Sequence, residues 1–169
     1  SVFNKLIVEK NGKFIFNGRS RRPPKDPVNA MLSLLYAILG QEISGAMESV
    51  GLDPQVGCLH AERPGRDSLA QDILEEFRAH IVDRLVLSLI NRQQIKIGDF
   101  TQTSIGGFLL TDEGRKRVLK AYQAKKQEEI VHPYLGEKVP IGLLPHMQAL
   151  LLARYIRGDL AYYPPFTGK

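Results

Sequence analysis

The chain has 169 residues, of which 43% are hydrophobic and 24% are charged. These are ordinary globular proportions, so they exclude wholesale disorder and fit about one domain. The net charge of +5 suits a nucleic acid or an anionic membrane as partner, and residues 1–25 alone carry a net +6. The single cysteine, Cys58, excludes an intrachain disulfide framework, and we interpret it as a reduced thiol in a cytoplasmic protein.

The first 25 residues form a basic N-terminal extension with two alternative conformations for its opening part. Asn11-Gly12 lies between two apolar runs and indicates a β-hairpin. Alternatively, residues 1–7 are the last turns of a helix that begins before Ser1. Pro23 and Pro24 exclude a helix around residues 19–25, so we expect an extended basic loop there.

Helical signals begin at Asp26-Pro27, an N-cap residue followed by proline at the first helical position. Apolar residues then recur at helical spacing, and Gly40 either ends this helix or weakens it before a second stretch over residues 41–50. Ser68, followed by Gln71 three residues later, indicates a capping box that opens the longest helix, which we expect to end near Asn91.

The second half of the chain predicts a short extended segment over residues 98–111 and two further helices. Thr111 caps a helix that reaches about Glu129, and a loop begins at His132. The last helix begins at Pro140 or Ile141 and ends at Gly158, before a proline-rich tail.

The expected fold is therefore mainly α, a single helical domain of five to six or more helices with a short extended or hairpin segment near its N-terminus. Residues 26–169 form its helical core. No stretch approaches 18 consecutive apolar residues, and the most apolar segment, residues 141–156, contains Pro145, His146 and Arg154. We therefore expect no membrane span.

Acidic residues near the start of the longest helix form the most informative cluster. Asp72 and Glu75 are three residues apart and project from one face, which Glu76 borders. Oxygen ligands in this pattern suit Mg²⁺ or Mn²⁺, and an imidazole from His60 in the preceding loop shifts the balance towards Mn²⁺. The alternative is that these acids only oppose the positive end of the helix dipole and that His60 is a polar surface group.

Two basic segments are candidate phosphate contacts. One is the loop of residues 19–25, and the other is the helical face of residues 115–126, which is alternatively a solvated surface. The sequence contains no glycine-rich phosphate loop, no paired-cysteine zinc pattern and no serine-hydrolase elbow.

Several stretches together resemble the C-terminal helical domain of a known family, the first CRISPR-associated core protein, which is an integrase and endonuclease of spacer acquisition. The resemblance covers essentially the whole chain. It is carried by residues 21–33, 51–60, 63–78, 83–87, 110–115 and 162–166.

The resemblance implies a role in CRISPR antiviral defence. Family members are metal-dependent DNA enzymes that use Mg²⁺ or Mn²⁺ and join a prespacer 3′-hydroxyl to the CRISPR repeat by transesterification. They form homodimers that hold a prespacer duplex together with the second CRISPR-associated core protein.

The resemblance also assigns roles to individual residues. His60 and Glu75 match two metal ligands at the catalytic site, and Asp72 matches an acidic position beside them. Arg78 matches a basic position suited to a phosphate. The residues expected to contact DNA are Arg19, Arg21, Arg22, Lys25, Arg63, Arg66 and Arg78.

The family's third ligand, a glutamate in a motif on the opening helix of the domain, has no match within these residues. We therefore expect residues 1–169 to be the catalytic helical domain of a longer protein, without the family's N-terminal β-domain and weakly active alone. Two rival hypotheses are a non-enzymatic DNA-binding module, because residues 106–115 resemble part of a winged helix, and a purely structural dimerisation domain.

Overall fold

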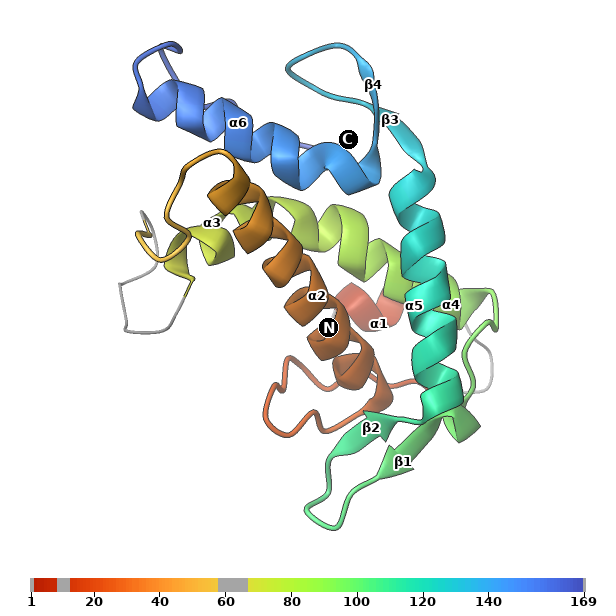
Figure 1. Cartoon of the computed structure of the whole chain (residues 1–169). Helices are drawn as coiled ribbons and strands as arrows, with labels where there is room; N and C mark the ends of the chain where they lie inside the picture. Colours follow the sequence, from red (N-terminus) through yellow and green to blue (C-terminus); the bar gives the residue numbers. More distant parts are fainter. Residues whose placement is uncertain (1, 9–12, 58–66, 169) are drawn as a thin grey trace. The chain divides into compact units, whose positions relative to one another are not determined.

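A computed structural model describes residues 2–8, 13–57 and 67–168 and is mainly helical, as the sequence predicts (Figure 1). Its helices are α1 (Val2–Leu6), α2 (Pro27–Ser49), α3 (Ser68–Phe77), α4 (Arg84–Asn91), α5 (Asp112–Gln127) and α6 (Leu144–Ile156). Its strands are β1 (Phe100–Gln102), β2 (Phe108–Leu110), β3 (Glu129–Val131) and β4 (Lys138–Pro140).

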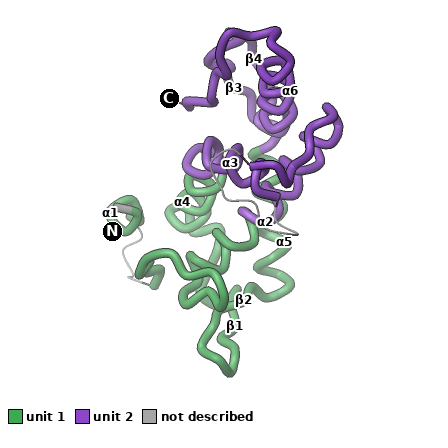
Figure 2. Tube along the Cα trace, turned by 90° about the vertical axis from the view of Figure 1, so that its left-hand side faces the viewer, with its two compact units in different colours: residues 1–35, 82–125 green, residues 36–81, 126–169 purple. Residues whose placement is uncertain are grey.

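The chain divides into two compact units, each assembled from two separate stretches of sequence (Figure 2). Unit 1 contains residues 1–35 and 82–125, and unit 2 contains residues 36–81 and 126–169. The boundary between the stretches falls inside α2, so this one helix contributes to both units.

The start of α2 forms as the sequence predicts. The carboxylate of Asp26 accepts hydrogen bonds from the backbone N and the side-chain Nδ2 of Asn29, each at 2.7 Å. These bonds satisfy a donor that the first helical turn would otherwise leave without a partner. The helix then continues through Gly40 to Ser49, so of the two alternatives Gly40 does not end it.

α2 is long and apolar enough to cross a membrane by length and composition alone, and half of the apolar window is buried inside the protein. A buried core helix has the same properties. Residues that α2 buries completely or almost completely include Val28, Met31, Leu32, Leu35, Leu39, Ile43 and Met47. This burial identifies α2 as a core helix.

The expected extended segment over residues 98–111 is an antiparallel hairpin of β1 and β2 that leads directly into α5 (Figure 1). Phe100 pairs with Leu110, and the loop is closed by hydrogen bonds between Thr103 and Gly107. Thr111 caps α5 as predicted, because its Oγ1 accepts a hydrogen bond from the backbone N of Gly114.

Gly114 allows the first turn of α5 to approach Asp99 closely. A Cβ atom at this position would lie 2.5 Å from the carbonyl oxygen and 2.9 Å from the Cβ of Asp99. We predict that Gly114→Ala lowers the free energy of unfolding by about 2 kcal/mol, because backbone atoms must move apart. Urea denaturation measures this loss.

Gly45 supplies the matched control for Gly114, because it also lies within a helix but a Cβ there would contact nothing within 4 Å. Gly45→Ala is expected to be neutral or to stabilise the protein by about 0.5–1 kcal/mol through helix propensity. If Gly114→Ala and Gly45→Ala changed the free energy of unfolding equally, the close approach of α5 to Asp99 would not make position 114 intolerant of a Cβ atom.

The structure corrects one sequence prediction for a helix start and favours one of the two alternatives for the N-terminus. The N-cap of α3 is Asp67 rather than Ser68, and no side-chain cap bond forms, so the predicted capping box is wrong. The carboxylate of Asp67 instead accepts a 2.6 Å hydrogen bond from Ser44 of α2, which removes it from a capping role. At the N-terminus, α1 favours the helix alternative, whereas the hairpin turn at residues 11–12 lies outside the described residues.

The helix expected over residues 68–91 is interrupted. A π-helical segment, Arg78–Asp83, joins α3 to α4. The extra residue per turn rotates the side chains that follow relative to those on α3. Single π-helical turns occur frequently at functional sites, and this one begins three residues after Glu75.

Candidate active site

The three acids on α3 have very different surroundings. Asp72 is buried, Glu75 is exposed and Glu76 is half-buried. All three lie within little more than one turn of a single helix in unit 2, as the sequence predicts. Glu75 is the most exposed of the three, with 48% of its side chain accessible.

The carboxylate of Glu75 is held by Arg78, one turn later on the helix. Arg78 Nη1 donates to both Glu75 oxygens, at 2.5 and 2.7 Å. The guanidinium also lies over the ring of Tyr36, with 4.8 Å between its central carbon and the ring centroid. Burial works against the charge of Arg78, but hydrogen bonds to Tyr36 and Glu75 outweigh it and raise the pKa of the guanidinium.

The resulting arrangement is an accessible carboxylate beside a cation that is fixed in place. A guanidinium stacked on an aromatic ring and bonded to a carboxylate has lost most of its rotamer freedom before a ligand arrives. Glu75 and Arg78 therefore offer an oxygen ligand for a cation and a donor for an anion within one helical turn.

Glu76, the adjacent residue, is occupied by a hydrogen-bond network within unit 2. Its Oε1 accepts a bond from the Tyr163 hydroxyl at 2.8 Å. Its Oε2 accepts bonds from Gln148 Nε2 at 2.9 Å and from the backbone N of Phe166 at 2.7 Å. The network ties α3 to α6 and to the chain after it, so Glu76 anchors the C-terminal segment.

Burial raises the pKa of Glu76, while the hydrogen bonds from Phe166, Tyr163 and Gln148 act in the opposite direction. Burial, together with the neighbouring charge of Glu76, raises the pKa of the Tyr163 hydroxyl well above its ordinary value. Three separate donors distant in sequence hold the half-buried Glu76 carboxylate, whereas among the described residues the exposed Glu75 carboxylate is bonded only to its helical neighbour Arg78. Glu76, which borders the face of Asp72 and Glu75, therefore belongs to this network.

The remaining members of this network were not anticipated from the sequence. His132 is buried, its Nε2 lies 3.1 Å from Gln148 Oε1, and its Nδ1 accepts bonds from the backbone N of Tyr134 and Leu135. Gln148 also donates to the Tyr163 hydroxyl at 2.7 Å. The available sequence signal was an amide, Gln148, at the centre of an apolar helix. The structure shows that this amide is buried, and a buried amide needs several hydrogen-bond partners.

Three of the residues assigned by resemblance, His60, Arg63 and Arg66, lie outside the described residues, as does Cys58. Among residues 2–8, 13–57 and 67–168, no group of three His, Cys, Asp or Glu side chains could hold a metal ion. The described part of the candidate site is therefore Asp72, Glu75 and Arg78.

The predicted DNA contacts in the basic loop lie in unit 1 and separate into two kinds. Arg19 is half-buried and donates to Asn29 Oδ1 at 2.8 Å and to Ser33 Oγ at 3.1 Å, so its side chain holds the loop on α2. The side chains of Arg21, Arg22 and Lys25 are exposed. None of the three forms an ion pair with a carboxylate among the described residues.

The fold is similar to that of two solved structures. A casposase bound to its integration product matches with a TM-score of 0.85 and 27% identity, over 99% of this chain and 50% of that chain. The Cas1-containing chain of a Cas6-RT-Cas1–Cas2 complex matches with a TM-score of 0.81 and 27% identity, over 99% of this chain and 18% of that chain.

The family model described as CRISPR associated protein Cas1 matches residues 1–124. The chain belongs to the Cas1 family. The CRISPR-associated endonuclease Cas1 1 of Chlorobaculum tepidum is 57% identical over all 169 residues, which cover 49% of that relative. The chain thus spans about half the length of this curated relative.

Proposed function

We propose that this chain supplies the catalytic helical part of a metal-dependent DNA endonuclease and integrase of CRISPR adaptation. In this reaction a prespacer 3′-hydroxyl is joined to the CRISPR repeat by transesterification. The observation that carries the proposal is the accessible Glu75 carboxylate beside the fixed Arg78 guanidinium, in a chain of the Cas1 family. The structural match to a casposase bound to an integration product supports the same reaction class.

The donor chemistry of α3 fits Mg²⁺ or Mn²⁺. Glu75 is an exposed oxygen donor, Asp72 is a second carboxylate one turn earlier, and the family resemblance adds the imidazole of His60. In this structure Arg78 occupies the Glu75 oxygens, so a metal cation has to displace the guanidinium before Glu75 can act as a ligand. We propose Glu75 and His60 as ligands, with Asp72 beside them and with the family's third ligand contributed from outside these 169 residues.

The bound metal would polarise the reacting phosphate and lower the pKa of the attacking hydroxyl or water. The chain's own residues act around it. Glu75 fixes the position of the cation, and Arg78 neutralises the phosphate charge as it redistributes during the reaction. Stacking on Tyr36 holds the guanidinium ready for this role and limits the entropy lost on binding.

We further propose that the protein works in the cytoplasm as a homodimer and binds the second CRISPR-associated core protein as well as DNA. The structural match to a Cas6-RT-Cas1–Cas2 complex supports this partner. The DNA forms proposed are a prespacer duplex and the CRISPR repeat.

The test uses the whole protein that carries this chain, with a labelled oligonucleotide ending in a 3′-hydroxyl and a duplex containing the repeat. We expect joined or cleaved products in Mn²⁺ or Mg²⁺ and none in EDTA. A strand ending in a 3′-deoxy nucleotide should be cleaved but never joined. A sequence-specific footprint in EDTA with no products in either metal would favour the DNA-binding module, and absence of any DNA binding would favour the dimerisation domain.

A further inference from the structure

The four residues from Glu75 to Arg78 divide into two pairs with different contacts, all within unit 2. Glu75 and Arg78 bond to each other, and the Arg78 guanidinium also stacks on Tyr36. Glu76 and Phe77, which lie between them in the sequence, contact the C-terminal segment (residues 163–168) instead. The two side chains proposed for the reaction are therefore linked by residues that are bound to a distant part of the chain.

The polar part of this attachment is centred on Glu76. Its carboxylate accepts hydrogen bonds from the Tyr163 hydroxyl at 2.8 Å and from the backbone N of Phe166 at 2.7 Å. Gln148 of α6 donates to the same carboxylate at 2.9 Å and to the carbonyl oxygen of Pro164 at 3.1 Å. These bonds fix the C-terminal segment against the last turn of α3.

The apolar part of the attachment is Phe166, which is only 4% exposed. The centroid of its ring lies 5.3 Å from that of Phe77 and 5.3 Å from that of His80. Gly168 follows so closely that a Cβ atom there would overlap the imidazole ring of His80. The C-terminal segment therefore packs on both sides of Arg78, because Phe77 precedes this residue and His80 follows it.

The backbone changes its helical form at the same place. Arg78 is the first residue of the π-helical segment, whereas Phe77 is the last residue of α3. A π-helical turn is rare, which indicates that contacts outside the helix favour it here. The packing of Phe166 on Phe77 and His80 supplies such contacts. The C-terminal segment is thus placed to hold the turn from which the Arg78 guanidinium reaches Tyr36 and Glu75.

We propose that the C-terminal segment positions Arg78, with Phe166 and Tyr163 holding the turn that places its guanidinium beside the reacting phosphate. The inference rests on the proposed function, in which Arg78 neutralises the phosphate charge as it redistributes. Phe166 and Tyr163 are positioning residues in this account, because they act only through Arg78. Their loss should lower the rate of the reaction and leave the binding of metal unchanged.

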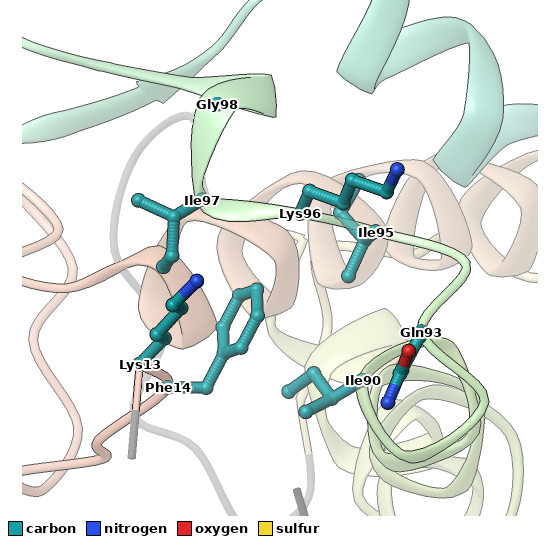
Figure 3. Close-up of a pocket in the computed structure, with 8 residues that line it drawn as sticks. All are labelled: Lys13, Phe14, Ile90, Gln93, Ile95, Lys96, Ile97 and Gly98. Atoms are coloured by element: carbon teal, nitrogen blue, oxygen red, sulfur yellow. The ribbon is translucent and has the colours of Figure 1, made fainter. Parts of the chain in front are cut away.

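Phe14 of unit 1 provides a matched control for Phe166. It is 6% exposed, and its ring lies edge-on to that of Phe100 with 6.1 Å between centroids. It faces a pocket of about 270 Å³ whose lining contains no carboxylate, imidazole or hydroxyl group (Figure 3). Phe14 therefore shares the burial and the ring packing of Phe166 in a part of the chain where no reacting group is proposed.

The test measures joining of labelled DNA in Mn²⁺ by the whole protein that carries this chain, at a temperature where urea denaturation shows each variant to be folded. Phe166→Leu should lower kcat about tenfold and change KM less than about twofold, because a displaced guanidinium no longer meets the phosphate in the transition state. In an Arg78→Ala background the same substitution should have no further effect on kcat. A protein that is merely destabilised loses the same fraction of its activity with or without Arg78, so this cycle separates the two roles.

Three further measurements complete the design. Phe14→Leu should lower the urea midpoint about as much as Phe166→Leu but leave kcat within about twofold in both backgrounds. Tyr163→Phe removes one hydroxyl and keeps the ring, so it tests the proposal even if Phe166→Leu fails to fold. It should lower kcat about threefold, again only where Arg78 is present. Mn²⁺ affinity measured by calorimetry should stay within about twofold in the Phe166 and Tyr163 variants.

Each outcome decides the proposal. Unchanged kcat in Phe166→Leu and Tyr163→Phe, or proportional losses that are equal with and without Arg78, would overturn the positioning role while leaving the metal-dependent reaction intact. An equal loss of kcat in Phe14→Leu and Phe166→Leu would overturn it as well. Absence of products from the unchanged protein in either metal would contradict the proposed function and this inference together. A loss of kcat that disappears with Arg78, at unchanged Mn²⁺ affinity, supports the proposal.

Discussion

Replacing Glu75 by alanine is expected to reduce metal-dependent cleavage and joining of DNA at least about a hundredfold, because the site loses an oxygen ligand of the metal. The fold should be unaffected. The side chain is 48% exposed, and its ion pair with Arg78 is of the surface i,i+3 type that contributes less than about 1 kcal/mol. Turnover of labelled DNA in Mn²⁺ measures the activity, and urea denaturation measures the stability.

Glu113 provides a matched control, because it is an exposed helical acid paired with Lys116 at the same i,i+3 spacing. Glu113→Ala should leave both activity and stability within about twofold and about 0.5 kcal/mol of the unchanged protein. His60→Ala, which removes the other proposed ligand, should match Glu75→Ala. Unaltered activity in both the Glu75 and His60 variants would refute the site assignment.

Glu76→Ala, unlike Glu75→Ala, is expected to destabilise the fold. The expected loss is about 3–5 kcal/mol of the free energy of unfolding. The substitution leaves the Tyr163 hydroxyl and the backbone N of Phe166 without the acceptor that they share. Each hydrogen bond to a charged group contributes about 1.5–3 kcal/mol, and Gln148 keeps other acceptors in the network. Chemical denaturation followed by circular dichroism measures the loss.

The companion variant is Glu76→Gln, which keeps one carbonyl oxygen and should recover about half of the stability lost in Glu76→Ala. Proteolysis of the C-terminal segment should accelerate in Glu76→Ala before the helical core unfolds, because the segment is released first. A Glu76→Ala protein as stable as Glu75→Ala would show that the network does not anchor this segment. Together the two alanine variants separate the chemistry of α3 from its structural role.

The helical architecture could be predicted because its signals are local. Asp26 and Thr111 act as caps through bonds to backbone groups within three residues, so the spacing alone identifies them. Asp67 shows the limit of this reasoning, because its carboxylate binds Ser44, which is 23 residues away. Whether a side chain caps its own helix or bonds to a distant partner depends on tertiary packing, which the spacing of residues in the sequence does not contain.

The different roles of Glu75 and Glu76 could not be predicted for the same reason. Adjacent residues of the same type differ only in what surrounds them, and the partners of Glu76 lie 72 to 90 residues away. The π-helical segment after Phe77 is equally invisible, because its residues are ordinary helix formers. The packing of Phe166 on Phe77 and His80 also required the fold.

Calorimetric titration of Mn²⁺ tests the central claim, that α3 holds a catalytic metal through Glu75, most directly. The whole protein that carries this chain should bind Mn²⁺, the Glu113→Ala control should bind it equally, and the Glu75→Ala variant should bind it at least about tenfold more weakly. Equal Mn²⁺ affinity in the Glu75→Ala variant and the unchanged protein would contradict the claim.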